Sequence, residues 1–281
     1  MGGMAGTVRG ATLLITGAAS GMGRDYAARA VREGAAAVVL WDRDAAALSR
    51  TADELGRTAM GRTQVRSYVV DLSELGAIAK VAHAVRREVG SPDVIINNAG
   101  IVRGNAYFWK NDSGDDIRST MLVNALAPMH VAREFLPAMI AARRPARIVN
   151  IGSAAGTLGN PRMAVYAASK AALAGWSDSL RLELRQAGHR HIRVTTVTPS
   201  YVATGMFRGA RGPLLAPVLE PDVVVDRVWR AMLAGRPLVE LPGSVRLSRV
   251  LRAVLPTTVF DRVVGDGFGI YRSMERFRGR G

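Results

Sequence analysis

Residues 11–23 read ATLLITGAASGMG, and this stretch decides the fold. Its first six residues form an apolar run that ends at a glycine, which predicts a short buried strand. Gly17, Gly21 and Gly23 then lead into a helix-like segment that ends at Gly34. Glycine permits a positive φ and a close backbone approach, and the N-terminus of a helix attracts anions. The stretch therefore predicts a strand, a turn and a helix that together hold the phosphates of a nucleotide.

The same alternation continues along the chain. Further strand-like runs lie at 36–41, 65–70, 94–97, 147–151, 192–198 and 238–241. Helix-like segments between them lie at 44–55, 72–89, 115–143, 163–187 and 222–234. Near-continuous apolar strands that alternate with helices indicate a parallel sheet covered on both faces. We therefore expect an α/β fold, a doubly wound parallel sheet in one domain over 1–242, with a helical extension over 243–281.

The composition excludes several classes of protein. The chain has 281 residues, 48% of them hydrophobic, and no cysteine, so it is neither disordered nor a disulfide scaffold and has no thiolate nucleophile. We expect no metal site, because the four histidines lack partners at metal-binding spacing. No apolar run reaches the roughly 18 residues of a membrane span and the N-terminus lacks a signal peptide, which predicts a cytoplasmic protein.

The net charge of +15 raises the question of nucleic acid. Of the 38 basic residues only three are lysine, and the arginines are scattered along the chain. No basic stretch is interleaved with the aromatic side chains on which bases stack. We therefore expect no nucleic-acid partner.

An acidic residue, Asp42, ends the second strand. A carboxylate at this place accepts hydrogen bonds from the adenine ribose of a dinucleotide and repels a 2′-phosphate, which favours NAD over NADP. Arg43 follows it and could bind that phosphate, so NADP stays the less favoured alternative. Asp42 could also cap the next helix, although Asp44 serves that purpose equally well.

Polar and small residues end the next two strands. Asp71 and Leu72 close the third, where Asp71 could bond an adenine amino group or merely cap a helix. Asn98, Ala99 and Gly100 close the fourth, which suits close contact with a flat ligand but also an ordinary turn.

Three residues suited to proton transfer follow the fifth strand. Ser153 lies just beyond that strand, and Tyr166 and Lys170 share one face of the next helix at i, i+4. An ordinary tyrosine titrates near ~10. A neighbouring ammonium, together with a cationic nicotinamide, favours the phenolate and lowers the tyrosine's pKa. The spacing therefore predicts a tyrosine that exchanges protons near neutral pH.

Taken together, these motifs resemble the short-chain dehydrogenase/reductase family. The resemblance covers about residues 10–242. It rests on Thr-Gly-x-x-x-Gly-Met-Gly at 16–23, Asn-Asn-Ala-Gly at 97–100, Asn124, Ser153, Tyr166-x-x-x-Lys170 and Pro199-Ser200-Tyr201-Val202-Ala203-Thr204. The family has Gly where this chain has Ser200, which leaves the backbone there open. The resemblance implies a Rossmann fold, and homodimers or homotetramers that pair through the helices following the fourth and fifth strands.

The resemblance also implies roles for individual residues. Tyr166 would be the acid/base, Ser153 would bond the substrate oxygen, Lys170 would hold the nicotinamide ribose, and Asn124 would position a water. The implied cofactor-binding residues are Gly17, Ser20, Gly21, Met22, Gly23, Asp42, Arg43, Asp71, Leu72, Asn98, Ala99, Gly100, Tyr166, Lys170, Pro199, Val202 and Thr204. The implied substrate contacts are Ser153, Tyr166, Met206 and Phe207.

Two segments lie beyond the cofactor motifs. Residues 205–217 predict a mobile lid over an apolar substrate, with an ordinary surface loop as the alternative. Residues 245–255 place Leu247, Val250, Leu251 and Val254 on one helix face opposite arginines, and the chain from 244 on carries a net charge of about +5. This basic amphipathic helix predicts either peripheral contact with an anionic membrane or packing on the body or on a partner subunit.

The extension, Trp41-Asp42 and the run 204–207 are similar to one branch of the family, the retinol dehydrogenases and 17β-hydroxysteroid dehydrogenase-like enzymes of lipid metabolism. This similarity implies a bacterial relative that transfers hydride between NAD(H) and a lipophilic alcohol or carbonyl: a retinoid, a steroid or a long-chain compound. One alternative is an NADPH-dependent carbonyl or 3-oxoacyl reductase. Another is an NAD-binding regulatory or scaffold protein without turnover.

Overall fold

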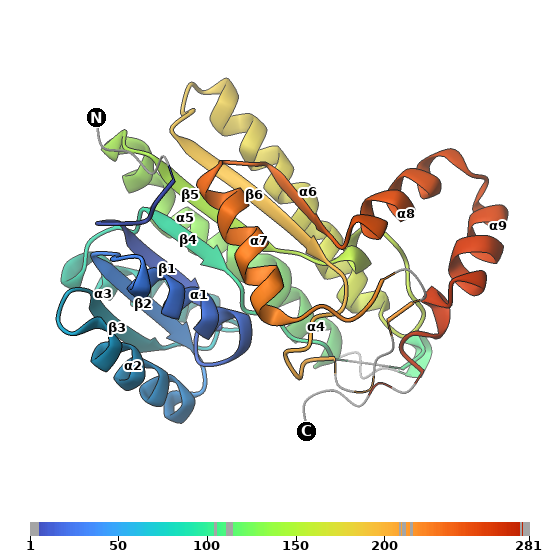
Figure 1. Ribbon diagram of the computed structural model, residues 1–281, viewed down its shortest axis with the longest axis horizontal. Helices are drawn as coiled ribbons and strands as arrows, with labels where there is room; N and C mark the ends of the chain where they lie inside the picture. Colours follow the sequence, from blue (N-terminus) through green and yellow to red (C-terminus); the bar gives the residue numbers. More distant parts are fainter. Residues whose placement is uncertain are drawn as a thin grey trace.

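A computed structural model describes residues 6–103, 106–110, 115–207, 209, 212–213, 216–275 and 277. Within these residues the centre is a seven-stranded parallel sheet in the order β3-β2-β1-β4-β5-β6-β7 (Figure 1). The strands are β1 Thr12–Thr16, β2 Ala37–Asp42, β3 Gln64–Val69, β4 Val94–Asn97, β5 Ala146–Ile151, β6 Ile192–Pro199 and β7 Leu238–Leu241. The order confirms the doubly wound α/β fold. Because the strand order reverses between β1 and β4, a crevice opens there at the carboxyl ends of the strands.

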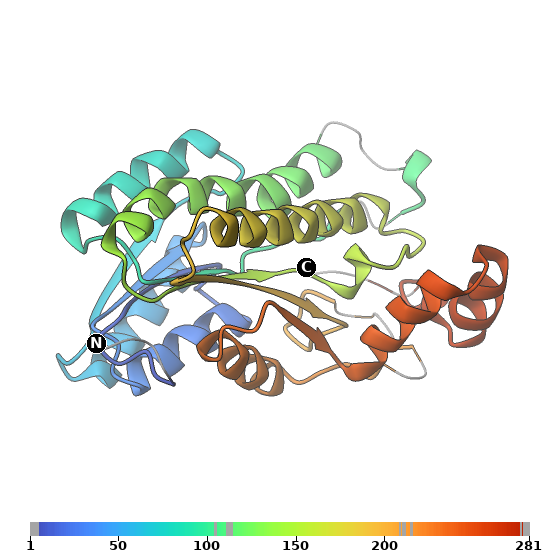
Figure 2. The ribbon, with the colours of Figure 1, turned by 90° about the horizontal axis from the view of Figure 1, so that it is seen from above.

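Helices cover both faces of the sheet (Figure 2). One layer holds α1 Gly21–Arg32, α2 Ala45–Ala59 and α7 Pro221–Leu233. The other holds α3 Leu75–Glu88, α4 Asp116–Met121, α5 Ala127–Ala142 and α6 Ala164–Gln186. Each layer has its own buried apolar cluster against the sheet, which explains why the strands read as continuous apolar runs.

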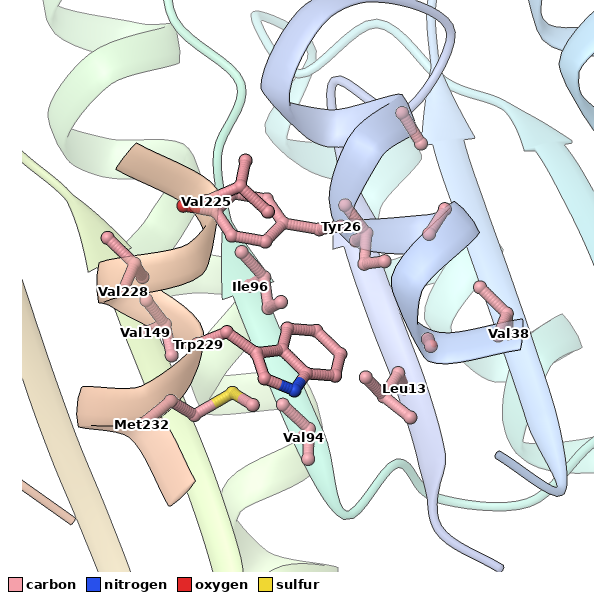
Figure 3. Packing of buried hydrophobic residues seen from close by; sticks show 14 of the residues in the cluster. Leu13, Tyr26, Val38, Val94, Ile96, Val149, Val225, Val228, Trp229 and Met232 are labelled. Atoms are coloured by element: carbon pink, nitrogen blue, oxygen red, sulfur yellow. The ribbon is translucent and has the colours of Figure 1, made fainter. Parts of the chain in front are cut away.

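Aromatic packing joins α1 to α7 in the first layer. The rings of Tyr26 and Trp229 are stacked with centroids 6.5 Å apart, above strand residues such as Leu13 and Ile96 (Figure 3). The Trp229 Nε1 donates to Glu33 at 3.0 Å, so the buried indole keeps a polar partner. This packing holds the helix whose N-terminus faces the crevice.

The helix after β4 differs from the expected continuous helix over 115–143. It begins at Asp116 and is interrupted by a π-helical turn over Leu122–Leu126, after which α5 continues. Residues 111–114 lie outside the described part of the chain. The wider turn places Asn124 against the backbone of Ile101, with which it exchanges two hydrogen bonds of 2.9 Å each. A π-bulge inside a helix is often found at a functional site.

The extension beyond residue 242 folds as a short chain of helices. α8 spans Gly243–Val254, α9 spans Thr257–Phe260, and a π-helical turn over Asp261–Gly267 precedes a 3-10 turn at Ile270–Arg272. The sequence predicted the first of these and none of the others. We call residues 243–267 the arm, because Figure 1 shows α8 and α9 reaching away from the body beyond β7. In the described residues, no helix has the length and apolar character needed to cross a membrane.

Candidate active site

The turn after β1 is open on the side that faces the crevice. Gly17 and Gly21 have φ of 66° and 54°, a conformation that favours glycine. A Cβ on Gly17 would approach the Ala99 Cα to 2.9 Å, so the turn also lies too close to the end of β4 for a side chain. The Thr16 Oγ1 accepts hydrogen bonds from the backbone N–H groups of Asn98 and Ala99, each 3.1 Å long. These contacts fix the ends of β1 and β4 side by side.

Gly23 has a different place from the other two glycines. A Cβ there would lie 2.0 Å from the carbonyl oxygen of Gly17 and 2.7 Å from Asn98 Nδ2. Gly23 is therefore a packing residue beneath the turn, and it does not line the cleft as a cofactor contact should. Its role is close packing of α1 on the strands, which is the usual role of the last glycine in this motif.

All the other residues expected to contact the cofactor line one continuous cleft at the carboxyl ends of the strands. They are Gly17, Ser20, Gly21, Met22, Asp42, Arg43, Asp71, Leu72, Asn98, Ala99, Gly100, Tyr166, Lys170, Pro199, Val202 and Thr204. Ser153, Met206 and Phe207 line it as well. The sequence reasoning did not assign Val70, Ile101, Val123, Ile151, Gly152 and Ser200 to the site, although each neighbours a motif residue.

Asp42 is held in place at the end of β2. Its two carboxylate oxygens accept one backbone N–H each, from Ala19 at 3.0 Å and from Asp44 at 3.1 Å. The N-cap of α2 is Asp44, which accepts from the N–H of Ala47 at 2.9 Å. Asp42 is therefore not the N-cap of α2, and it lines the cleft.

Asp71 forms a turn of its own before α3. Its Oδ1 accepts from both the N–H and the hydroxyl of Ser73, and these bonds hold the pKa of the carboxyl below its ordinary value. The turn delays the start of α3 to Leu75, where the sequence predicted 72, and the N-cap is Glu74. Asp71 thus does not cap the helix, and it lines the cleft.

Tyr166 and Lys170 lie at the deep end of the cleft. Both side chains are almost fully buried, with 4% of each residue exposed. The Lys170 Nζ donates to the carbonyl of Ile151 at 2.8 Å and lies 5.8 Å from the centre of the Tyr166 ring. Ser153 follows β5 and hydrogen-bonds Tyr166. The structure brings together the three groups that the sequence placed in one constellation.

Burial shifts the pKa of both members of this pair. Burial raises the pKa of Tyr166 to about 12, and the hydrogen bond with Ser153 opposes that rise only in part. Burial also lowers the pKa of Lys170 to about 8. In the protein alone, desolvation of the phenolate sets the direction of the shift, and the lowering predicted for Lys170 together with a cationic nicotinamide stays a prediction for the cofactor complex. At neutral pH the tyrosine is a neutral phenol and the lysine is mostly cationic.

Asn124 lies behind the cleft instead of lining it. Its Oδ1 accepts from the Ile101 N–H, and its Nδ2 donates to the Ile101 carbonyl and to the Ser169 hydroxyl at 3.1 Å. A Cβ on Gly100 would lie 3.4 Å from Asn124 Oδ1 and 3.5 Å from Lys170 Nζ. Asn124 therefore acts as a positioning residue that holds the Gly100–Ile101 backbone beside Lys170.

A buried polar chain that the sequence did not reveal anchors α6 to the sheet. Asn97 Nδ2 donates to Asn150 Oδ1 at 2.8 Å, and Asn150 Nδ2 donates to Ser177 Oγ at 2.8 Å. The chain links β4, β5 and α6, so it fixes the helix that carries Tyr166 and Lys170. Its sequence signal is weak, because Asn150 is a single amide within an apolar strand.

A second, largely apolar cavity adjoins the cleft and shares Ser153, Ser200 and Phe207 with it. Its walls come from four parts of the chain: the loop after β5, the end of β6, the segment 205–217, and the extension. The lining residues from the last two are Phe207, Pro213, Ala216, Ser244, Val245, Leu247, Ser248, Leu251, Phe268, Ile270 and Ser273. Met206, expected at the substrate, lines only the cofactor cleft. Of the segment 205–217, Phe207, Pro213 and Ala216 line the cavity, while residues 208, 210–211 and 214–215 lie outside the described part of the chain, so the lid stays a prediction.

Phe207 stands between the cleft and this cavity. Its ring meets Tyr166 edge-on with centroids 6.0 Å apart and meets Tyr201 edge-on at 5.3 Å. On the far side, Asn160 Nδ2 donates to the Tyr201 hydroxyl at 3.1 Å and to the Ser273 hydroxyl at 3.0 Å. These bonds tie the extension to the catalytic body across the cavity.

Comparison with known proteins identifies the family of this chain. Residues 11–213 match the family described as short chain dehydrogenase. The chain belongs to the short-chain dehydrogenase/reductase family. It is therefore an oxidoreductase that uses NAD(P).

Its relatives in the family are named for retinol and steroid chemistry. The chain is 35% identical to epidermal retinol dehydrogenase 2 of Mus musculus, over 97% of this chain and 87% of that protein. It is 32% identical to estradiol 17-beta-dehydrogenase 11 of Rattus norvegicus, over 91% of this chain and 83% of that protein. These similarities confirm the resemblance to the retinol dehydrogenase and 17β-hydroxysteroid dehydrogenase-like branch.

Solved structures of the family share the fold and differ in cofactor. A Burkholderia phymatum family member in complex with NAD superposes with a TM-score of 0.78 at 28% identity, over 88% of this chain and 94% of that one. A Sphingobium yanoikuyae short-chain dehydrogenase in complex with NADPH superposes with a TM-score of 0.72 at 27% identity, over 92% of this chain and 94% of that one. The family thus accommodates both cofactors, and the choice in this enzyme depends on its own residues.

The cleft of this chain fits a dinucleotide. Gly17, Ser20, Gly21 and Met22 line the cleft at the N-terminus of α1, where N–H groups and the helix dipole favour a pyrophosphate. Gly100 likewise has no Cβ between the cleft and Lys170. Asp42, Tyr166 and Lys170 all line this cleft, so the residues expected to hold the two riboses of a dinucleotide share one cavity.

Proposed function

We propose that the enzyme prefers NAD(H) and interconverts a lipophilic alcohol with its carbonyl compound. The observation that carries the substrate class is the apolar cavity that opens from Ser153 beside the buried Tyr166. The fixed carboxylate of Asp42 supports the cofactor preference. The names of the relatives agree with a retinoid, a steroid or a long-chain compound.

The chemistry assigns a task to each residue. Bound NAD(H) accepts or supplies the hydride. Ser153 donates a hydrogen bond to the reacting oxygen of the substrate and stabilises the charge that develops on it. As a phenolate, the form that a bound cationic nicotinamide favours, Tyr166 takes the hydroxyl proton in oxidation; as a neutral phenol it returns the proton in reduction. Lys170 keeps a positive charge beside the phenol, and Phe207 closes the side of the site toward Tyr201.

Replacing Asp42 tests the cofactor preference. In Asp42→Ala, the ratio of kcat/KM with NAD to that with NADP should fall roughly tenfold or more, because the carboxylate no longer bonds the ribose or repels a 2′-phosphate. Steady-state kinetics with both cofactors measure the ratio. The matched control is Asp44→Asn, two residues away and outside the cleft, which should leave it unchanged. A wild-type enzyme that prefers NADP, or an unaltered ratio in Asp42→Ala, contradicts the proposal and favours an NADPH-dependent carbonyl reductase.

A polar substitution in the cavity tests the substrate class. Leu251 lines the cavity, so Leu251→Asp should lower kcat/KM for long apolar alcohols about tenfold while the KM for NAD stays constant. Val254 is 68% exposed on the same helix and does not line the cavity, which makes Val254→Asp the control. A panel of short, long-chain and polycyclic alcohols provides the readout. Equal effects of the two variants would refute the cavity assignment, and tight NAD binding without oxidation of any alcohol would favour a non-catalytic role.

A further inference from the structure

Large apolar side chains are exposed on the arm. Leu247, Val250, Val254, Val259 and Val263 are between 42% and 68% exposed, and all five lie within 17 residues of chain. Isolated exposed apolar residues are ordinary, but a contiguous group marks an interaction surface. Figures 1 and 2 both show the arm standing away from the sheet, so the body does not cover this face.

A second apolar group lies at the same end of the molecule. Tyr107, Phe108 and Trp109 are 43%, 56% and 76% exposed, and the rings of Tyr107 and Trp109 are stacked 5.0 Å apart. The guanidinium of Arg162 lies 5.1 Å from the Tyr107 ring centre and donates to the carbonyl of Glu275 at 3.2 Å. We call residues 107–110 the aromatic turn. Arg162 therefore connects the aromatic turn to the segment that follows the arm.

The charges around these apolar groups are mainly positive. In the arm, Arg249 pairs with Glu240 and Arg252 pairs with Asp261. The exposed Arg246 and Arg262 have no acidic partner within salt-bridge distance among the described residues. The aromatic turn adds one more positive charge, Lys110. The exposed acidic residues in the same region are Asp266 and Glu275. Exposed aliphatic and aromatic side chains beside cationic ones suit the boundary between lipid headgroups and acyl chains.

The arm is also a wall of the substrate cavity. Leu247 lines that cavity and is 51% exposed to the outside, so the cavity reaches the surface on the arm. A second copy of the chain fits this surface less well, because a two-fold interface would bring the unpaired Arg246 and Arg262 toward the same positive surface of the partner. An anionic lipid surface complements both the charge and the apolar groups.

We propose that the arm and the aromatic turn dock on an anionic phospholipid surface, and that the lipophilic substrate passes from the lipid into the cavity beside Leu247. The docking stands on the exposed residues alone, whereas the passage of substrate rests on the proposed function. The two parts are separable, because vesicle binding needs no turnover.

Co-sedimentation with phosphatidylcholine vesicles, with and without phosphatidylserine, tests the docking in the full-length protein. The wild type should bind the phosphatidylserine vesicles and lose binding as salt rises. Trp109→Ala combined with Val254→Asp should weaken binding roughly tenfold or more. Arg246→Gln with Arg262→Gln should reduce the preference for phosphatidylserine. The control is Met60→Ala, which removes a 77% exposed apolar side chain at the end of α2 and should change nothing.

Oxidation of a short, water-soluble alcohol in vesicle-free buffer shows whether each variant is folded and active, and all of them should retain it. Absence of wild-type binding, or equal binding by Trp109→Ala/Val254→Asp, overturns the proposal. Gel filtration without lipid supplies a further outcome. If the wild type is an oligomer that the same double substitution separates, the surface belongs to a second copy of the chain and the lipid proposal fails.

Discussion

Tyr166→Phe should lower kcat for alcohol oxidation about 10³-fold and leave the KM for NAD nearly unchanged. The substitution removes only the phenolic oxygen, so the ring keeps its edge-on contact with Phe207 and its place among buried neighbours such as Met163. Without that oxygen, neither direction of the reaction has a group within the site that exchanges the proton, and general acid–base catalysis contributes about 10²–10⁴-fold. Steady-state kinetics with NAD measure the loss.

Tyr201→Phe is the matched control for this experiment. Tyr201 is a partly buried tyrosine whose ring also meets Phe207, and its hydroxyl bonds Asn160 and Ser273 at the far side of the cavity. Its loss should alter the KM of the alcohol and not the rate of the chemical step. If Tyr166→Phe kept near-normal turnover, or if the two variants were equally impaired, Tyr166 would not be the acid/base.

The pH dependence of oxidation gives the same residue a second test. Burial raises the pKa of Tyr166 to about 12, so the phenolate that accepts a proton becomes more populated as pH rises through the alkaline range. The kcat/KM for oxidation should therefore increase with pH, whereas carbonyl reduction, which needs the neutral phenol, should not. A bound cationic nicotinamide favours the phenolate and moves the rise to lower pH. The rise should disappear in Tyr166→Phe.

The sequence identified most of the residues that line the cleft because these residues follow strands. Asp42, Asn98 and Ser153 each lie directly at or after the end of an apolar run, and parallel strands bring those ends to one edge of the sheet. A local pattern then determines a spatial neighbourhood. Tyr166 and Lys170 were also found from a local pattern, because residues i and i+4 share a helix face whatever the tertiary structure.

The features that the sequence did not predict depend on contacts between distant segments. The sequence predicted that Gly23 contacts the cofactor. The structure shows that it packs against the carbonyl group of Gly17, a contact that the sequence pattern does not reveal. The bonds of Asn124 to the Ile101 backbone depend on a π-helical turn that helical periodicity does not predict, and its role in positioning a water stays a prediction. Periodicity identified the apolar face of α8 without showing what the face contacts, and part of it, including Leu251, lines the apolar cavity beside the cleft.

Lys170→Met should abolish most activity and at the same time stabilise the folded protein. The ammonium is nearly inaccessible to water and bonds the Ile151 carbonyl, and burial lowers its pKa from 10.5 to about 8. Each pKa unit corresponds to 1.36 kcal/mol, so holding this charge costs about 3 kcal/mol at neutral pH. Methionine fills a similar volume without charge, and the unpaired carbonyl should offset part of the gain.

The sign of the pH dependence follows from the same shift. As pH falls from about 10.5 to about 8, the unfolded chain binds a proton at residue 170 before the folded protein does, so the wild type loses stability across that window. The advantage of Lys170→Met in the free energy of unfolding should therefore be full below about pH 8 and vanish toward pH 10.5. Urea unfolding of both proteins at several pH values measures the difference.

Lys170→Arg separates the roles of charge and shape. Arginine keeps a positive charge that does not titrate in this range, but its larger planar head does not fit the lysine's place beneath Gly100. We expect it to be both inactive and less stable than the wild type. If Lys170→Met proved less stable than the wild type at pH 7, the buried ammonium would be a structural group held by its bond to Ile151. A gain in stability with a loss of activity instead assigns the unfavourable charge to catalysis, since folding alone would not retain it.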